Sequence, residues 1–283
     1  MNGYILINKK AGMTSHDVVN RARKKLNIKK IGHTGTLDPF AEGLLILLIG
    51  NATKLAYFFD GLDKKYKGTI QFGTSTDTYD LTGTVLQKKE PALSIYDVDN
   101  AIQELTGTYY QTPPIYSAIK VDGKKLYQYA RENKEVEIKK RLVEVNSFQR
   151  ISEINNNALD FEASVSSGTY IRSLTVDLAD KLGEVAHLSK LVRTDICIYS
   201  MKDALDVENI TINDVISDIE IFSGIKNSII LDDYMIKLVK NGVALDERQI
   251  VTDKPFLVYD KKSNLVAYYE VNGVNKYVVR YLF

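Results

Sequence analysis

Eight consecutive residues, from Gly32 to Pro39, combine side chains that could take part in catalysis. They read Gly-His-Thr-Gly-Thr-Leu-Asp-Pro. Because a residue before proline is disfavoured in an α-helix, we expect Asp38 in an extended or turn conformation, and the glycines allow a ligand to approach the backbone closely. A carboxylate presented in this way can act as a nucleophile or a base. An isolated Asp-Pro is more often a simple turn, so the rest of the segment supports this interpretation.

This segment, continued by Phe40–Leu45, resembles the catalytic loop of the bacterial tRNA pseudouridine-55 synthases of the TruB type. Four further stretches resemble that family in the same order: Asn8–Ser15, Lys64–Gly68, Tyr116–Lys120 with Gly123–Tyr127, and Ser167–Leu174. The family's first motif usually reads Asp-Lys-Pro, whereas this chain has Asn8-Lys9-Lys10. We expect that change to affect local rigidity more than chemistry.

The resemblance implies a role for five active-site residues. Asp38 would be the catalytic carboxylate, and Arg172 would pair with it and aim it. Tyr66 would stack on the target base, while Tyr170 and Leu191 would form walls of the pocket. Taken singly, each has an ordinary alternative, such as a surface ion pair for the arginine or a core position for the leucine.

The resemblance also implies residues that bind RNA. His33 would contact the nucleotides around a flipped-out uridine, although it could instead only cap the loop. Residues 113–140 resemble the family's thumb-like insertion, which grips RNA. Its basic side chains are the candidates for phosphate contacts: Lys120, Lys124, Lys125 and Arg131.

Pseudouridine formation breaks an N-glycosidic bond, rotates the uracil and rejoins it through C5. Nothing is oxidised and no group is brought in, so we expect no metal and no coenzyme. The three histidines, His16, His33 and His187, show no spacing typical of metal ligands. The sequence leaves open whether Asp38 attacks C1′, attacks the uracil ring at C6, or abstracts the 2′ proton.

The formal net charge is only +1, but the charges are unevenly distributed. Residues 1–72 carry 12 Lys/Arg and 5 Asp/Glu, whereas residues 201–233 carry 2 and 8. A basic excess around the motifs suits a polyanionic partner, although a solvated helix face would look the same. The single cysteine, the lack of a signal-peptide pattern and the short apolar runs favour a cytoplasmic protein without membrane contact.

Strands and helices alternate without a regular βαβ repeat, which favours an α+β fold around one large sheet. The resemblance implies a mixed, mainly antiparallel sheet with the cleft across its face. Patterns predict strands at Tyr4–Asn8, Tyr66–Gly73 and Ala158–Val165. Capping-box patterns predict helices that begin after Thr14 and after Ser94.

The character of the chain changes near residue 225. We expect residues 1–225 to form the synthase domain and residues 226–283 a small β-rich domain. Its predicted strands are Phe256–Tyr259, Leu265–Tyr269 and Tyr277–Tyr281. The resemblance implies a PUA-like RNA-binding fold for this part.

The sequence therefore predicts an isomerase, a tRNA pseudouridine(55) synthase that acts on the T stem-loop of tRNA without an obligate protein partner. One alternative is the related guide-RNA-dependent synthase that works in an assembly. Another is a non-catalytic protein that binds or folds tRNA. The joint presence of Asp38, Tyr66 and Arg172 favours an enzyme, because a pure RNA binder has no use for a buried acid facing phosphates.

Overall fold

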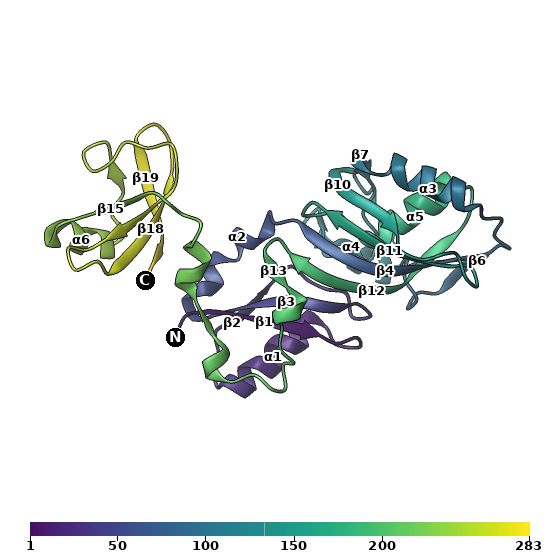
Figure 1. The fold of residues 1–283 in the computed structure, drawn as a ribbon, viewed down its shortest axis with the longest axis horizontal. Helices are drawn as coiled ribbons and strands as arrows, with labels where there is room; N and C mark the ends of the chain where they lie inside the picture. Colours follow the sequence, from purple (N-terminus) through teal and green to yellow (C-terminus); the bar gives the residue numbers. More distant parts are fainter. Residues whose placement is uncertain (133) are drawn as a thin grey trace.

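The computed structural model describes residues 1–132 and 134–283. A ten-stranded sheet forms most of the body of the molecule (Figure 1). Eight of its strands follow one another in the order β14 (Ile216–Ser217), β1 (Gly3–Lys9), β3 (Glu42–Ile49), β12 (Ala186–Ile196), β4 (Lys64–Phe72), β11 (Ala158–Val165), β10 (Arg141–Arg150) and β7 (Gly107–Gln111). At the side, β2 (Ile31–Thr34) pairs with β3, and β13 (Tyr199–Ser200) pairs with β12.

The pairing of these strands confirms the predicted fold class. Among the strands that the structure describes in this sheet, β12 and β3 run parallel and the other pairs are antiparallel. The sheet is thus mixed and mainly antiparallel, as an α+β fold around one large sheet requires.

The helix that follows β1 begins where its capping pattern predicts. α1 (Ser15–Leu26) has Thr14 at its N-cap, and Thr14 and Asp17 form a reciprocal capping box. Its apolar residues are buried on one face and pack with β1 and β3: Val18, Val19, Ala22 and Leu26. This packing holds the first part of the sheet on which the Asp38 loop is mounted.

Two further helices cover the other part of the sheet, where Figure 1 shows them close together. α3 (Ile95–Glu104) follows Ser94 as predicted, but the Ser94 side chain makes no capping hydrogen bond. α5 (Ile171–Lys181) buries Leu174 and Leu178 in the same apolar core. Arg172 therefore enters the molecule from the first turn of a firmly packed helix.

The remaining short elements connect the large ones. They are η1 (Gly50–Leu55), α2 (Tyr57–Asp60), β5 (Thr74–Thr76), β6 (Val85–Lys88), β8 (Lys120–Val121), β9 (Lys124–Lys125), α4 (Leu126–Arg131), η2 (Met201–Asp203), η3 (Ile212–Asp214) and η4 (Asp218–Phe222). β5 pairs with β6, and β8 pairs with β9.

The C-terminal part forms a lobe of its own, drawn in yellow-green in Figure 1. Its five-stranded sheet has the order β15 (Ser228–Ile230), β17 (Phe256–Tyr259), β18 (Leu265–Val271), β19 (Lys276–Leu282) and β16 (Leu245–Asp246). Three of these strands lie where the sequence predicts them. The sequence analysis missed α6 (Asp233–Lys240), whose Ile236 and Val239 pack against this sheet.

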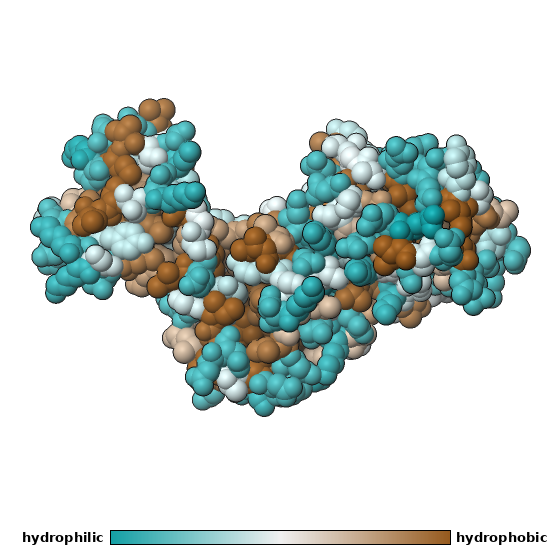
Figure 2. Space-filling view, viewed as in Figure 1, coloured by the Kyte–Doolittle hydropathy of each residue, from teal (hydrophilic) through white to brown (hydrophobic). Residues whose placement is uncertain are grey.

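An aromatic cluster joins the two lobes, although a broad notch separates them on one side (Figure 2). The ring of Phe222 lies 4.9 Å from that of Tyr268 and 5.1 Å from that of Phe283. The Tyr281 hydroxyl donates a hydrogen bond to the Asp218 carboxylate. No helix in the described part of the chain is both long and apolar enough to cross a membrane.

Candidate active site

Asp38 lies on the short connection between β2 and β3. The sequence suggests a loop over the whole segment from Gly32, but its first residues belong to β2, which pairs with β3. At Gly35 the backbone turns with a φ of +68°, a conformation that favours glycine. The turn then presents Asp38, whose carbonyl accepts a hydrogen bond from Ala41 N at 3.1 Å.

Arg172 and Asp38 form the predicted ion pair. Arg172 Nε lies 2.8 Å from Asp38 Oδ2, and Nη2 donates a hydrogen bond of 3.1 Å to Oδ1. Only the second contact has the geometry of a hydrogen bond. The Arg172 side chain is 5% exposed and that of Asp38 is 34% exposed, so the carboxylate can be reached while its partner is buried.

A second carboxylate, which the sequence analysis missed, holds Arg172 from the other side. Arg172 Nη1 lies 3.5 Å from Asp80 Oδ2 and donates to Thr78 O at 3.0 Å. Nη2 also donates to Tyr116 O at 3.0 Å. The guanidinium is therefore fixed by two carboxylates and two carbonyls, which orients the face that it turns to Asp38.

Asp80 is itself held in a threonine-rich turn. Its Oδ1 accepts hydrogen bonds from Thr78 Oγ1 at 2.8 Å and from Thr82 N at 2.9 Å. Thr76 Oγ1 donates to the Asp80 carbonyl at 2.7 Å. The sequence signals such a turn through its repeated threonines, but gives no sign that this turn meets a loop so far away in the chain.

The groups around Asp38 shift its pKa in opposite directions. Burial raises the pKa of Asp38, the positive charge of Arg172 lowers it, and the negative charge of Asp80 raises it again, with a net upward shift. The carboxylate must be ionised to act as a nucleophile or base, so Arg172 opposes the penalty that burial imposes.

An apolar wall stands beside the carboxylate. Tyr66 on β4 and Leu191 on β12 are both buried, and they belong to one core cluster with Leu37, the residue before Asp38. Tyr170 is the N-cap residue of α5, and its N–H donates to Gln111 Oε1 at 2.8 Å. The charges of Arg172 and Asp38 both act on the Tyr170 phenol, so these residues lie around one site.

His33 lies on β2, not on a free loop. Burial, with the positive charges of Arg193 and His16, lowers the pKa of its imidazole, which favours the neutral form. Its Nδ1 is buried, and no partner for it lies in the described residues. A neutral ring with an unused polar atom can still hydrogen-bond to a nucleotide.

The predicted RNA-binding insertion carries its basic residues on short elements, and residue 133 within it lies outside the described residues. Lys120 and Arg131 are exposed. Lys124 Nζ lies 5.0 Å from the centre of the Tyr129 ring, and Lys125 Nζ lies 5.6 Å from that of Tyr127. Lys124 also forms an ion pair with Glu132 at 2.5 Å, so part of its charge is already neutralised within the insertion.

Lys9, from the first matching motif, also acts directly on the Asp38 loop. It is 1% exposed, and its Nζ donates to Met13 O at 2.7 Å and to Pro39 O at 3.4 Å. Burial lowers the pKa of Lys9 to about 8, although the charge of Asp38 opposes that shift. The sequence analysis expected only local rigidity from this motif, and the structure adds a charged contact beneath the loop.

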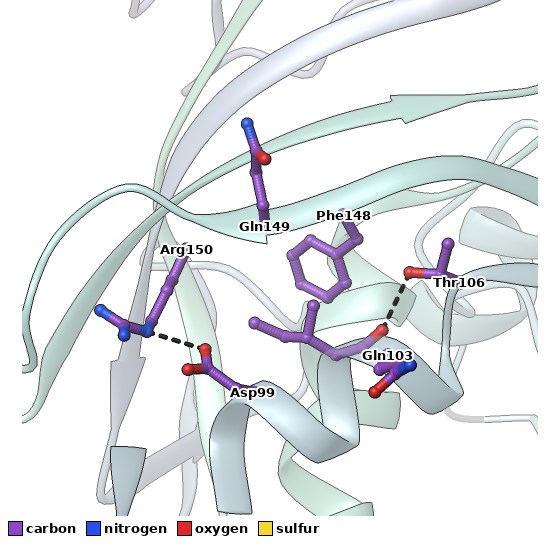
Figure 3. Close-up of a pocket in the computed structure, with 7 residues that line it drawn as sticks. Asp99, Gln103, Thr106, Phe148, Gln149 and Arg150 are labelled. Atoms are coloured by element: carbon purple, nitrogen blue, oxygen red, sulfur yellow. Dashed lines mark hydrogen bonds and ion pairs between the residues drawn. The ribbon is translucent and has the colours of Figure 1, made fainter. Parts of the chain in front are cut away.

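A hollow of about 480 Å³ elsewhere on the surface contains none of the predicted site residues (Figure 3). It lies between α3 and β10, where Arg150 Nε donates to Asp99 Oδ1 at 2.7 Å and the Phe148 ring faces the helix. Arg150 and Asp99 neutralise each other there, so the Asp38 site remains the candidate active site. In the described residues, no group of three or more His, Cys, Asp or Glu side chains is arranged to hold a metal ion.

Comparisons with known proteins agree with this fold. The model of the TruB family pseudouridylate synthase (N terminal domain) matches residues 23–171. The chain is 49% identical to the tRNA pseudouridine synthase B of Acholeplasma laidlawii (strain PG-8A) over 283 residues, which cover 100% of both chains. It is 47% identical to the tRNA pseudouridine synthase B of Onion yellows phytoplasma (strain OY-M) over 284 residues, again 100% of both.

Solved structures show the same architecture. The crystal structure of the archaeal box H/ACA sRNP Nop10-Cbf5 complex contains a chain with a TM-score of 0.69 and 20% identity, covering 99% of this chain and 85% of that one. At this identity the likeness concerns the fold alone. The fold and the family match define a pseudouridylate synthase, which is an isomerase. The chain belongs to the TruB family of these enzymes.

Proposed function

We propose that this chain converts the T-loop uridine of tRNA, position 55 in standard tRNA numbering, to pseudouridine, with Asp38 as the catalytic carboxylate. The observation that carries the proposal is the ion pair between Asp38 and the buried Arg172, at 2.8 Å, in a member of this family. The tRNA substrate is supported by the names of relatives 49% and 47% identical over the whole chain.

In the proposed reaction each of these residues has a part. The target uridine leaves its stack, at a cost of a few kcal/mol, to reach the partly open Asp38. Tyr66 stacks on the uracil, and Leu191 and Tyr170 confine the detached base while it rotates. Arg172 favours the ionised form of Asp38 and aims the carboxylate before it reacts, which lowers the barrier without a cofactor.

In this proposal the RNA contacts surround the Asp38 site. His33, on β2, would meet nucleotides next to the flipped uridine, and the exposed Lys120 and Arg131 would meet phosphates of the T stem. We further propose that the chain divides near residue 225 and that residues 226–283 form a PUA-like domain, supported by the separate five-stranded sheet. The substrate would then be bare tRNA in the cytoplasm, without an obligate protein partner.

Tritium release from tRNA transcript labelled at uracil C5 tests the proposal. Wild type should release tritium, Asp38→Asn should not, and a transcript with cytidine in place of the T-loop uridine should give none with either protein. The assay contains no guide RNA and no other protein, so release also excludes dependence on an assembly. Tight binding of the transcript without release by wild type would overturn the proposal.

A further inference from the structure

Arg193, on β12, is a buried cation that the reaction described above does not use. Its side chain is 1% exposed, and no carboxylate forms an ion pair with it in residues 1–132 and 134–283. Burial lowers the pKa of two other buried cations, Lys9 and Lys64, to about 8, and the positive charge of Arg193 adds to both shifts. Burying a charge without an acidic partner is unfavourable. The contacts that the Arg193 guanidinium makes in place of an ion pair therefore need an explanation.

Those contacts reach the backbone on both sides of Asp38. Arg193 Nη2 donates to Gly35 O at 2.9 Å, and Nε donates to Leu44 O at 2.8 Å. Gly35 is the residue at which the chain turns out of β2, so its carbonyl lies beyond the β2–β3 pairing. One guanidinium therefore joins the beginning of the Asp38 loop to the strand that follows it.

The backbone of Arg193 is held in place as well as its side chain. It pairs with Tyr66 of β4 on one side and with Gly43 of β3 on the other. A Cβ atom at Gly43 would lie 2.3 Å from Arg193 O, so only a glycine allows this close approach. The main chain of Arg193 is thus held beside Tyr66, while its side chain holds the loop of Asp38.

We propose that Arg193 is a positioning residue that sets the separation between the Asp38 carboxylate and the Tyr66 ring. This inference rests on the proposed function. Its role differs from that of Arg172, which binds the Asp38 carboxylate itself. Arg193 acts on the loop backbone, since its buried guanidinium donates its hydrogen bonds to the carbonyls of Gly35 and Leu44. Loss of Arg193 should slow the chemical step and leave RNA binding almost unchanged.

Arg193→Met and Arg193→Lys test this role, with Arg23→Met as the matched control. Arg23 also donates to a backbone carbonyl near the loop, that of Ile31 at 2.8 Å, but it does not reach the Asp38 turn. In single-turnover tritium release at saturating enzyme, Arg193→Met should lose about 10²-fold in rate, because a small misplacement of reacting groups has effects of that size. Arg193→Lys should lose less, since an ammonium can still reach one carbonyl, and Arg23→Met should behave as wild type.

Hydrogen exchange supplies a readout that needs no RNA. The amides of Leu37 and Ala41 are hydrogen-bonded to Ser15 Oγ at 2.9 Å and to Asp38 O at 3.1 Å. They should exchange faster in Arg193→Met than in wild type or Arg23→Met. The exchange measurement separates the proposed function from the positioning role of Arg193. No tritium release by wild type would overturn the proposed function, whereas the exchange of these two amides would still support or overturn the hold of Arg193 on the Asp38 loop.

Three results would overturn the inference. One is a wild-type rate in folded Arg193→Met. Another is a fall in tRNA affinity as large as the fall in rate, which would make Arg193 a binding residue. The third is unchanged exchange of Leu37 and Ala41. If Arg193→Met does not fold, the same measurements on Arg193→Lys decide, since unchanged rate and exchange there would contradict the hold of Arg193 on the Asp38 loop.

Discussion

The Asp38 site and the insertion at residues 113–140 both contain charged side chains, but the arginine of the first is buried and the basic residues compared in the second are exposed. At the site, Arg172 is 5% exposed and its guanidinium contacts Asp38, Asp80 and two carbonyls. In the insertion, Lys120 and Arg131 are exposed, and Arg131 lies 5.3 Å from the Tyr127 ring.

The proposed function gives a reason for this difference. A catalytic carboxylate must keep one geometry through the reaction, so its partners are buried and fixed before substrate arrives. A residue that grips a phosphate backbone gains from reach and adjustment, and its charge remains available because water covers it. The following predictions test that contrast, from the largest expected effect to the smallest.

Asp38→Asn should reduce turnover by about 10⁴-fold or more, because an amide cannot serve as nucleophile or base. Its affinity for tRNA should stay close to that of wild type, since the insertion is untouched. Tritium release and filter binding on the same preparations measure the two quantities. Loss of both would mean that Asp38 maintains the structure, and the contrast between the regions would then fail.

The affinity for tRNA should fall steeply with salt, by about 10³-fold between 50 and 200 mM if roughly six phosphates are contacted. The single-turnover rate at saturating enzyme should change little, because Arg172, the partner of Asp38, is buried and salt screens partly buried pairs much less than exposed charges. Titrations at several salt concentrations measure the slope. A flat response would contradict a binding surface of exposed cations.

Asp80→Asn should lower the single-turnover rate by about 10²-fold, because Arg172 loses one of its two charged partners. It should also move the acid limb of the rate profile to lower pH. Asp38 must be ionised, so the rate falls as pH drops through its pKa, and the negative charge of Asp80 helps to raise that pKa. A pH–rate profile from pH 5 to 8 measures the shift.

An acid limb that moves to higher pH in Asp80→Asn would contradict this arrangement. It would show that Asp80 matters mainly by holding Arg172 against Asp38, so that its loss leaves Asp38 without its stabilising cation. Thr82→Val serves as the control, because it removes a hydroxyl that contacts Asp80 and leaves both charges in place.

Lys120→Ala with Arg131→Ala should weaken tRNA binding by about 10-fold. The magnitude of the salt slope should fall by about 0.7 to 0.9 for each phosphate that the protein no longer neutralises. The rate at saturating enzyme should remain that of wild type. Lys202→Ala, an exposed lysine of η2 in the acidic segment 201–233, is a control for a general loss of positive charge. An equal loss of rate at saturation would show that the insertion also organises the active site.

Much of the fold could be predicted from local patterns. The Thr14 capping box forms as expected, and the strand at Ala158–Val165 has the predicted bounds. Other features of the fold could not be predicted from local sequence patterns. The Ser94 pattern precedes a helix without making its cap, and β2 takes up the first three residues of the expected loop because β3 offers it a strand edge.

The residues of the candidate site also divide into those that the sequence identified and those that only the structure identified. The resemblance pointed to Asp38 and Arg172, and the structure places them in contact. Asp80 and Arg193 went unnoticed, because a turn rich in threonine and an arginine in a strand have many ordinary roles. Only their contacts with Arg172 and with the Asp38 loop single them out.

The sequence by itself determined the residue types that the reaction needs and the periodicity of the elements that carry them, because both depend on neighbours within a few positions. The tertiary structure alone decided which charges meet. Asp38, Asp80 and Arg172 come from a turn after β2, a turn after β5 and the first turn of α5, and the sheet and its core bring them within hydrogen-bonding range. Contacts over such separations depend on packing and strand register, which no local stretch of sequence specifies.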